Sequence, residues 1–294
     1  MHPRLAVEYL WIESEGDQLT DQSLAAAGGK GLFTRAVERA LLDCQADIAI
    51  HSLKDLPTKI VPGLTIVAIP RRADPRDCLI THHQVATIED LPHNAVIGTA
   101  SPRRASQLLE RRSDFDIQLL RGNVETRLRK VLEEQQVDAT LLAAAGLGRC
   151  GLEEHDKFPL DTDIMLPAAG QGALAVQCRI DDSVAMGRCL PLNHAATSAA
   201  VHCERAIIAG LSGDCHSPIA VYAQPLEPDA QRYRLRARVL APDGSQCAQI
   251  DVESACDGLT RSAHDAVKAL KDQGADQLLV MKPPQRSSVG SGVA

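Results

Sequence analysis

AVIGTASPRRASQLLERRSDFDIQLLRGNVETRLRKVLEEQQVDATLLAAA, residues 95–145, is the stretch of sequence that decides the fold. In it, short apolar runs alternate with segments in which apolar residues recur at helical spacing. Serine followed by proline is a typical helix start, because the hydroxyl caps free N–H groups and proline fits the first turn. The alternation of strands and helices indicates a parallel α/β sheet. We predict a strand at 95–98, a helix from Ser101-Pro102 to about Arg112, a strand at 116–120, a helix at 124–136 and a strand at 138–145.

The flanking segments extend this pattern. The polar run Arg-Arg-Ala-Asp-Pro-Arg-Asp (71–77) is expected to be a hinge or crossing segment. The region after the turn Gly170-Gln171-Gly172 is expected to include a separate α+β domain, and 283–294 a disordered tail. Upstream, we predict strands at 6–13, 47–53 and 64–69 and a helix at 32–42. Downstream, we predict a helix at 195–211, strands at 220–224, 233–240 and 248–252, and a helix at 259–272.

Composition bounds the class of protein. The chain has 294 residues, a net charge of −7 and 2% aromatic residues. Its length allows two or three domains with hydrophobic cores. The net charge gives no general attraction for polyanions, and so few aromatic rings argue against base stacking, so no nucleic-acid partner is expected. The N-terminus lacks an apolar signal region and no run reaches membrane-spanning length, which predicts a cytoplasmic protein without membrane contact.

The cysteines include one candidate nucleophile. There are nine, with irregular spacing and no C-x-x-C pair, so no zinc ribbon, thioredoxin-type motif or other metal site is expected. Most are expected to be reduced core residues. Cys215 differs, because it lies in Leu-Ser-Gly-Asp-Cys-His-Ser-Pro-Ile-Ala (211–220), between a predicted helix and a predicted strand. On such a loop a thiol can be exposed, and His216 could assist its ionisation whereas Asp214 would oppose it.

Arginines gather at two successive turns from strand to helix. Arg103 and Arg104 follow the Ser-Pro helix start, and Arg121 and Arg127 flank the turn Arg-Gly-Asn-Val-Glu-Thr-Arg. Both turns fall at the carboxyl ends of predicted parallel strands, where α/β proteins bind ligands. Helix N-termini and guanidinium groups both bind carboxylates, so we expect a site for a polyanionic ligand. Solvated surface arginines are the alternative, which two neighbouring turns make the weaker interpretation.

Three further features are open to two interpretations. Lys54-Asp55 follows the strand at 47–53, and the pair is either a surface ion pair or part of a site. His51 is equally consistent with a hydrogen-bonded core histidine. Gly28-Gly29-Lys30-Gly31 is similar to a phosphate-binding loop, but it lacks the usual spacing and is a weak nucleotide signal.

Together, seven motifs in order give the chain a close resemblance to the porphobilinogen deaminase (hydroxymethylbilane synthase) family, from about Ala6 to about Val280. They are Gly-Gly-Lys-Gly-Leu-Phe (28–33), Asp-Ile-Ala-Ile-His-Ser-Leu-Lys-Asp-Leu-Pro (47–57), Asp-Pro-Arg-Asp (74–77), Ile-Gly-Thr-Ala-Ser-Pro-Arg-Arg (97–104), Leu-Arg-Gly-Asn-Val-Glu-Thr-Arg (120–127), Leu-Pro-Ala-Ala-Gly-Gln-Gly-Ala (166–173) and the Gly-x-Cys loop at 213–215.

The resemblance implies an activity and a set of site residues. The loop cysteine, here Cys215, would form a thioether to a dipyrromethane cofactor made from two porphobilinogen units. Four porphobilinogen molecules would then be joined head to tail with loss of ammonia, and water would release hydroxymethylbilane for porphyrin and haem biosynthesis. Asp55 would be the catalytic carboxylate that stabilises the cationic azafulvene formed as ammonia leaves. The arginines that would neutralise acetate and propionate groups are Arg103, Arg104, Arg121, Arg127 and Arg149. The other positions near the cofactor are Lys30, Ser52, Lys54, Thr99, Ser101 and Gln171.

The resemblance also implies a monomer with three domains. Two are α/β domains like those of type II periplasmic binding proteins, formed by 1–72 with 170–191 and by 76–167. The third, at 193–282, is a smaller α+β domain that carries Cys215. Family members begin with a strand and helix bearing Thr-Arg-x-Ser-x-Leu-Ala, whereas Met1 stands directly before what resembles the family's second strand. We therefore expect the first domain to lack this strand–helix segment, which leaves the activity of the chain to be tested.

The alternative function is a non-catalytic or inactive two-lobed protein that binds a small carboxylate. Arginines at strand-to-helix turns would serve such a receptor equally well. Cys215 separates the two hypotheses, because a passive receptor has no use for a loop thiol. A covalent adduct of dipyrromethane size would favour the enzyme.

Overall fold

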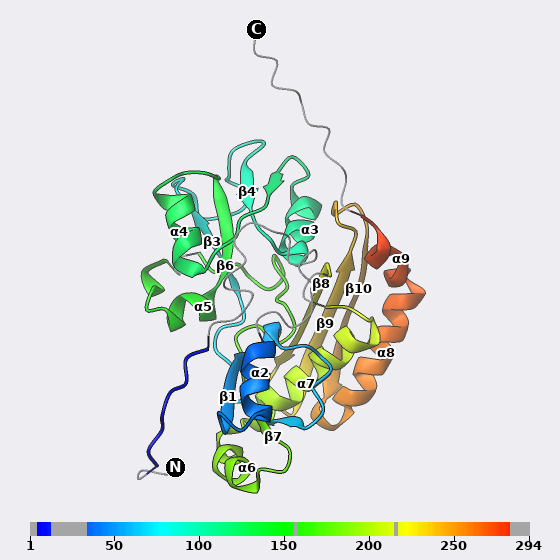
Figure 1. The fold of residues 1–294 in the computed structure, drawn as a ribbon. Helices are drawn as coiled ribbons and strands as arrows, with labels where there is room; N and C mark the ends of the chain where they lie inside the picture. The colour runs from blue at the N-terminus through cyan, green and yellow to red at the C-terminus, as the bar shows by residue number, and fades with distance from the viewer. Residues whose placement is uncertain (1–4, 13–33, 156–157, 215–216, 283–294) are drawn as a thin grey trace.

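The computed structural model describes residues 5–12, 34–155, 158–214 and 217–282. In this part of the chain the strands form three sheets, each with helices packed against it (Figure 1). The protein is therefore a mixed α/β fold. No helix in the described ranges is long and apolar enough to cross a membrane.

The first sheet has β7 at its centre, antiparallel to a strand on either side. Two helices pack against it. Helix α2 (Arg35–Leu42) contributes Leu41 to a hydrophobic cluster with Ala49 and Leu64. Helix α6 (Ser183–Cys189) contributes Ala185 to a cluster with Val176. In order, its elements are β1 (Ile48–Ser52), β7 (Leu174–Arg179) and β2 (Leu64–Ala68), with helices α2 (Arg35–Leu42) and α6 (Ser183–Cys189) and the 3-10 helices η1 (Leu53–Asp55) and η3 (Leu190–Leu192).

The second sheet is mixed. β4 runs parallel to β5 and β6, as the sequence predicts, but β3 runs antiparallel to β6. Successive residues of β3 point to opposite faces of this sheet. On one face Leu79 packs with Leu108 of helix α3 (Pro102–Arg111), and on the other Ile80 packs with Val131 of helix α4 (Val124–Leu132). In order, its elements are β3 (Asp77–Thr81), β6 (Ala139–Ala143), β4 (Val96–Gly98) and β5 (Asp116–Gln118), with α3 (Pro102–Arg111), α4 (Val124–Leu132), α5 (Ala144–Arg149) and η2 (Glu153–His155).

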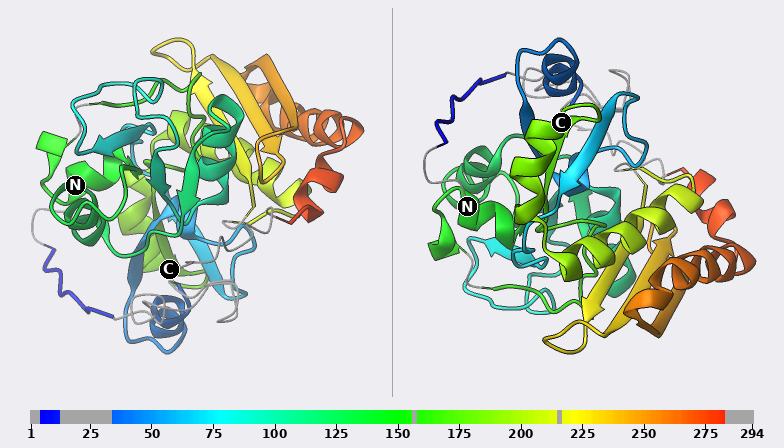
Figure 2. Two further views of the ribbon diagram at one scale, coloured as in Figure 1. Left: turned by 90° about the horizontal axis from the view of Figure 1, so that it is seen from above. Right: turned by 90° about the horizontal axis from the view of Figure 1, so that it is seen from below.

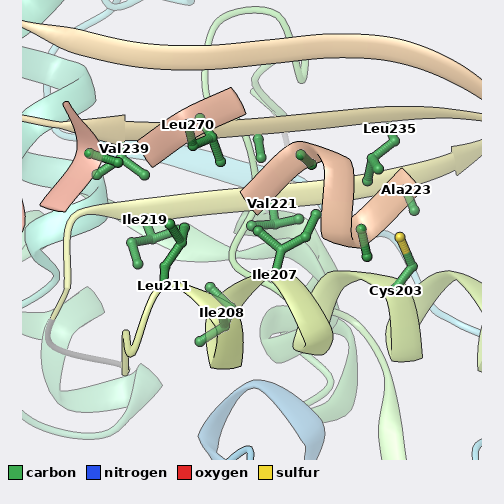
Figure 3. Packing of buried hydrophobic residues seen from close by; sticks show 14 of the residues in the cluster. Cys203, Ile207, Ile208, Leu211, Ile219, Val221, Ala223, Leu235, Val239 and Leu270 are labelled. Carbon is green, nitrogen blue, oxygen red and sulfur yellow. The ribbon is translucent and has the colours of Figure 1, made fainter. Parts of the chain in front are cut away.

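The third sheet is antiparallel, and helices cover one of its faces. Figure 3 shows two side chains of α7 lying against the sheet, Ile207 beside Val221 and Cys203 beside Ala223. Helices α8 (Leu259–Asp272) and α9 (Ala275–Val280) lie on the outer side of this sheet, away from the other two sheets (Figure 2). In order, the elements are β10 (Cys247–Ala255), β9 (Arg232–Leu240) and β8 (Ile219–Pro225), with α7 (Ala195–Gly210), η4 (Cys256–Gly258), α8 (Leu259–Asp272) and α9 (Ala275–Val280).

Two crossing segments, 69–76 and 166–173, join the first and second sheets and lie side by side. The Ala73 N–H donates a 3.1 Å hydrogen bond to the Gly172 carbonyl. Gly172 has φ +84, and a Cβ there would lie 2.7 Å from the Ala73 carbonyl oxygen, so only glycine fits without strain. The buried carboxylate of Glu204, on α7, accepts hydrogen bonds from Arg72, from the Gly170 N–H and from the Ala223 N–H of β8. One side chain thus connects both segments to the third sheet.

Several sequence predictions need correction. Residues 6–12 do not form a strand, and in every view the segment lies on the outside of the fold (Figures 1 and 2). The expected crossing segment 71–77 is irregular only to 76, because Asp77 begins β3, a strand that the sequence did not reveal. The described strands of the first sheet all pair antiparallel. The helix at 259–272 is confirmed residue for residue. The tail at 283–294 lies outside the described residues.

Candidate active site

Asp55, the predicted catalytic carboxylate, lies on η1 directly after β1 and is exposed to solvent. The turn is fixed by Leu53, which is buried and whose N–H donates a 3.1 Å hydrogen bond to the Ala173 carbonyl. Ser52, which ends β1, is half-buried and pairs with Leu174 of β7. A buried leucine therefore anchors the turn from which the Asp55 carboxylate projects.

Lys54, next to Asp55, lies close to charged groups of the second sheet. Burial lowers the pKa of the Lys54 ammonium below its ordinary value. The negative charges of Asp55 and Asp77 oppose this pKa shift, whereas the positive charges of Arg104 and Arg103 add to it. Lys54 therefore brings the turn after β1 together with the beginning of α3.

Arg103 and Arg104, predicted to bind a ligand, are buried and already paired with a carboxylate. Their side chains lie 2.7 and 2.6 Å from the two oxygens of Asp77. Arg103 also donates to the Leu166 carbonyl at 2.7 Å. Burial raises the pKa of the Asp77 carboxyl, but the charges of Arg103 and Arg104 outweigh that effect, so its pKa lies well below the ordinary range. The three side chains form a buried, charge-assisted cluster.

The start of α3 is built as its sequence predicts. Ser101 is the N-cap, and its hydroxyl accepts a 3.4 Å hydrogen bond from the Arg104 N–H. The Thr99 hydroxyl, which is buried, accepts a 3.1 Å hydrogen bond from the Ser101 N–H. Both hydroxyls are thus used within the turn between β4 and α3, and they orient its backbone.

Arg127 and Arg149 lie within the electrostatic reach of Asp55. Burial lowers the pKa of Arg127 to about 10, the positive charges of Arg104 and Arg121 add to the shift, and Asp55 opposes it. Burial likewise lowers the pKa of Arg149, and again Asp55 opposes the shift. The Arg127 Nε donates to the Gly122 carbonyl at 2.7 Å, and Arg149 donates to the Gly172 carbonyl at 3.0 Å. Neither has an ion pair with a carboxylate in the described residues.

Gln171 lies beneath this group, on the second crossing segment. Its side chain is buried and donates 2.7 and 3.1 Å hydrogen bonds to the Pro75 carbonyl and to Asp77. Its Oε1 is also buried and finds no hydrogen-bond donor among the residues that the structure describes. Such an atom is costly to leave unpaired, so it marks a place where a donor from outside the protein would be stabilised.

Together these residues form what we call the cationic site: Lys54, Arg103, Arg104, Arg121, Arg127 and Arg149 around the carboxylates of Asp55 and Asp77. Among the described residues of this group the cations outnumber the carboxylates, although the chain as a whole carries a net charge of −7. A site with this balance attracts a ligand with several carboxylates, and Asp55 offers it one exposed counter-charge.

Two predicted site residues, Lys30 and Cys215, lie outside the described residues. Near Cys215 in the sequence, the Ser217 hydroxyl donates a 3.1 Å hydrogen bond to the Asp214 carboxylate. Cys44 and Cys150 are exposed free cysteines, so exposure alone does not single out one thiol. His51 is buried and lies 2.9 Å from the Gln177 side chain, which confirms its interpretation as a hydrogen-bonded core histidine.

Sequence reasoning missed two acidic residues that organise the site. Asp77 appeared only as the last residue of Asp-Pro-Arg-Asp, and its role depends on arginines from a helix further along the chain. Glu204 lies on the buried face of α7, between Val201 and Ile207. A lone glutamate among apolar residues at helical spacing was the signal that could have identified it, because buried carboxylates are nearly always paired.

The chain is similar to two known family models and, more distantly, to solved structures. Residues 2–186 match the model of the porphobilinogen deaminase dipyrromethane cofactor-binding domain, and residues 198–272 match that of the porphobilinogen deaminase C-terminal domain. Among solved structures, YhfZ from Shigella flexneri is similar over 52% of this chain and 68% of its own, with 19% identity and a TM-score of 0.25. A YaeC-family lipoprotein from Enterococcus faecalis is similar over 58% of this chain and 77% of its own, with 13% identity and a TM-score of 0.28.

Those two structural likenesses are too distant to carry an argument. The family models are different in kind, because the first alone spans more than half of the chain and contains Lys54, Asp55 and every arginine of the cationic site. On these matches, the chain belongs to the porphobilinogen deaminase family.

Proposed function

We propose that the protein is a hydroxymethylbilane synthase, a transferase that joins four porphobilinogen molecules head to tail with loss of ammonia and releases hydroxymethylbilane by hydrolysis. The observation that carries this proposal is the cationic site around one exposed carboxylate, in a chain of the porphobilinogen deaminase family. Porphobilinogen bears an acetate and a propionate, so each added unit brings two negative charges to be neutralised.

The residues present fit a dipyrromethane cofactor. Its two pyrrole units would bring four carboxylates to a site rich in cations, and its pyrrole N–H groups are donors that the Gln171 Oε1 lacks among the described residues. Lys54, Arg127 and Arg149 would hold its carboxylates. When bound, the cofactor supplies a primer on which the chain of pyrroles is extended, attached through a thioether to Cys215. Lys30 and Ser52 are proposed as further contacts.

Asp55 would act on the substrate. As ammonia leaves the aminomethyl group of porphobilinogen, positive charge develops on the pyrrole, and an exposed carboxylate fixed on η1 stabilises that charge. The same carboxylate would accept hydrogen bonds from pyrrole N–H groups and hold the ring in place for proton transfer. Its neighbouring cations bind the acetate and propionate, so the reacting ring is oriented from both sides.

We also propose different roles for the arginines. Arg103 and Arg104 are bound to Asp77, so their first duty would be to shape the site and set its field. Arg127, Arg149 and Arg121 would contact ligand carboxylates. The division into two α/β domains, 1–72 with 170–191 and 76–167, and a third domain at 193–282 is proposed on the same family basis, as are a monomeric state and a cytoplasmic location.

Intact-mass measurement of Cys215→Ser and its parent tests the covalent step. We expect the parent to carry an adduct of dipyrromethane size and the variant to carry none, because a hydroxyl is a far poorer nucleophile than a thiolate. Cys150→Ser is the matched control, because Cys150 is an exposed free thiol and its loss should leave the adduct in place. A parent without an adduct that binds porphobilinogen unchanged would favour the non-catalytic carboxylate-binding alternative.

A further inference from the structure

A second group of ligand-bearing side chains lies at the far end of β3 from Asp77. His82 and His83 directly follow β3, and Asp138 directly precedes β6. β3 and β6 lie side by side (Figure 1) and pair antiparallel, with Thr81 opposite Ala139. The three side chains therefore meet at one corner of the second sheet. Their candidate ligand atoms all lie within 4.8 Å of one another. The corner is separated from Asp77 by the length of β3, about 13 Å.

The backbone of this corner is held by hydrogen bonds. The Thr81 hydroxyl donates to the Asp138 carbonyl at 2.7 Å and accepts from the His83 N–H at 3.1 Å. The Asp138 carboxylate accepts a 2.7 Å hydrogen bond from the Val96 N–H through one oxygen. Its other oxygen is directed to the His83 Nε2, 2.8 Å away. The two segments that carry the three side chains are therefore fixed relative to each other.

The two imidazoles present unused ligand capacity. The His82 and His83 rings lie 4.2 Å apart between centroids and are tilted by 36°. The His82 Nδ1 is shielded from solvent and has no hydrogen-bond partner in the described part of the chain. A buried nitrogen without a partner calls for an explanation, and a bound ion is one of the few available. Two imidazoles and one carboxylate are a common ligand set for zinc and related divalent ions.

We propose that His82, His83 and Asp138 bind a divalent transition-metal ion of the zinc class, which clips the end of β3 to the beginning of β6. In tetrahedral zinc sites the ligands lie about 2.0–2.2 Å from the metal, so they are about 3.3–3.5 Å from one another. The ligand atoms here need to move by no more than about 1.5 Å to reach that geometry. His83 and Asp138 are 29% and 28% exposed, which leaves a path for the ion and room for a water as fourth ligand.

This site is independent of the proposed catalysis. The spacing of the cysteines pointed to no metal site, but imidazole and carboxylate ligands that come together only through strand pairing have no such signature. Because the corner is at the opposite end of β3 from the cationic site, the ion would stabilise the second sheet and would take no part in the reaction.

The test is metal binding by the full chain, first stripped with a chelator. We expect one equivalent of Zn²⁺ to bind in competition with a chromophoric chelator and to raise the melting temperature. Co²⁺ in its place should give visible d–d bands without the near-ultraviolet band of thiolate-to-cobalt charge transfer. The variant His82→Gln/His83→Gln should weaken Zn²⁺ binding by at least about 100-fold, because even second-shell changes cost 10- to 100-fold.

The matched control is His93→Gln, since His93 is an exposed histidine in the same part of the chain, 2.9 Å from the carboxylate of Asp114. It should bind Zn²⁺ like the parent. If the double variant does not fold, Asp138→Asn replaces it, because the amide oxygen can still accept the Val96 N–H while ligating metal poorly. A parent that binds no Zn²⁺, affinity unchanged by these substitutions, or a thiolate-type Co²⁺ spectrum would overturn the proposal.

Discussion

The guanidinium of Arg104 and the carboxylate of Asp77 form a buried ion pair, 2.6 Å long, at the base of the cationic site. Arg103 binds the other carboxylate oxygen at 2.7 Å, so one anion compensates two cations that have almost no access to water. The sequence led us to expect both arginines to face a ligand. The structure places a resident carboxylate there instead, and this makes Asp77 a residue on which the fold depends.

Asp77→Asn should therefore destabilise the protein strongly. Removing one partner of a buried pair leaves the other charges uncompensated, and the free energy of unfolding should fall by about 3–5 kcal/mol. Urea denaturation measures this loss. Asp74→Asn is the control, because Asp74 pairs with Arg76 where both side chains are 33–41% exposed, and such a pair contributes less than about 1 kcal/mol. Equal losses in the two variants would contradict the role given to Asp77.

The same cluster predicts a dependence of stability on pH. The pKa of Asp77 is lower in the folded protein than in the unfolded chain. The ionised carboxylate therefore contributes fully to the free energy of unfolding above about pH 4, and this contribution is lost as the pH falls below that value. Asparagine does not titrate, so the gap in unfolding free energy between the parent and Asp77→Asn should narrow as the pH is lowered from about 6 to about 3. A constant gap over that range would show that folding does not lower the pKa of Asp77.

Asp55→Asn should affect turnover and leave the fold intact. The substitution keeps the size of an exposed side chain but removes the charge that faces the developing cation, which typically costs about 10²–10³ in turnover. Porphobilinogen consumption and thermal melting, measured together, separate the two effects. Asp43→Asn, which alters an exposed aspartate paired with Arg39, should change neither quantity. Near-normal turnover by Asp55→Asn would exclude it as the catalytic carboxylate.

Two glycine-to-alanine substitutions should have opposite signs. Gly172→Ala places a Cβ 2.7 Å from the Ala73 carbonyl at φ +84, and a strained backbone of this kind costs about 1–3 kcal/mol. Gly187→Ala lies within α6 with nothing within 4 Å of its Cβ, and alanine in a helix gains about 0.5–1 kcal/mol over glycine. Chemical denaturation of both variants checks the prediction. An unchanged stability of Gly172→Ala would refute the tight contact between the crossing segments, and destabilisation by Gly187→Ala would refute the open environment of that residue in α6.

The sequence predicted best what local chemistry determines. The Ser101 N-cap with Pro102 begins α3, and the helix at 259–272 has the predicted bounds, because caps and helical periodicity act within a few residues. Strand partners were harder. β3 is a five-residue strand with only three apolar residues, and it lies antiparallel to β6, while β7 reaches the centre of the first sheet from far along the chain. Nothing in the local pattern of either strand encodes its neighbour or its direction.

The same limit applies to the candidate site. Strand-to-helix turns drew attention to the arginines, since these turns gather at one edge of a parallel sheet. Whether a given guanidinium is free or neutralised depends on long-range contacts, and Asp77 decides this for Arg103 and Arg104. Residues 6–12 alternate roughly as the residues of a strand do, but they form none. Alternation shows which side chains would share one face of a strand, and it does not show that a neighbouring strand is present to pair with it.

Incubation of the purified chain with porphobilinogen, followed by quantification of ammonia, residual porphobilinogen and released hydroxymethylbilane, tests the proposed function most directly. We predict one ammonia for each porphobilinogen consumed and the release of hydroxymethylbilane at one molecule for every four porphobilinogen molecules. Porphobilinogen that binds and is recovered unchanged, with no ammonia and no bilane, would contradict the assignment as a hydroxymethylbilane synthase.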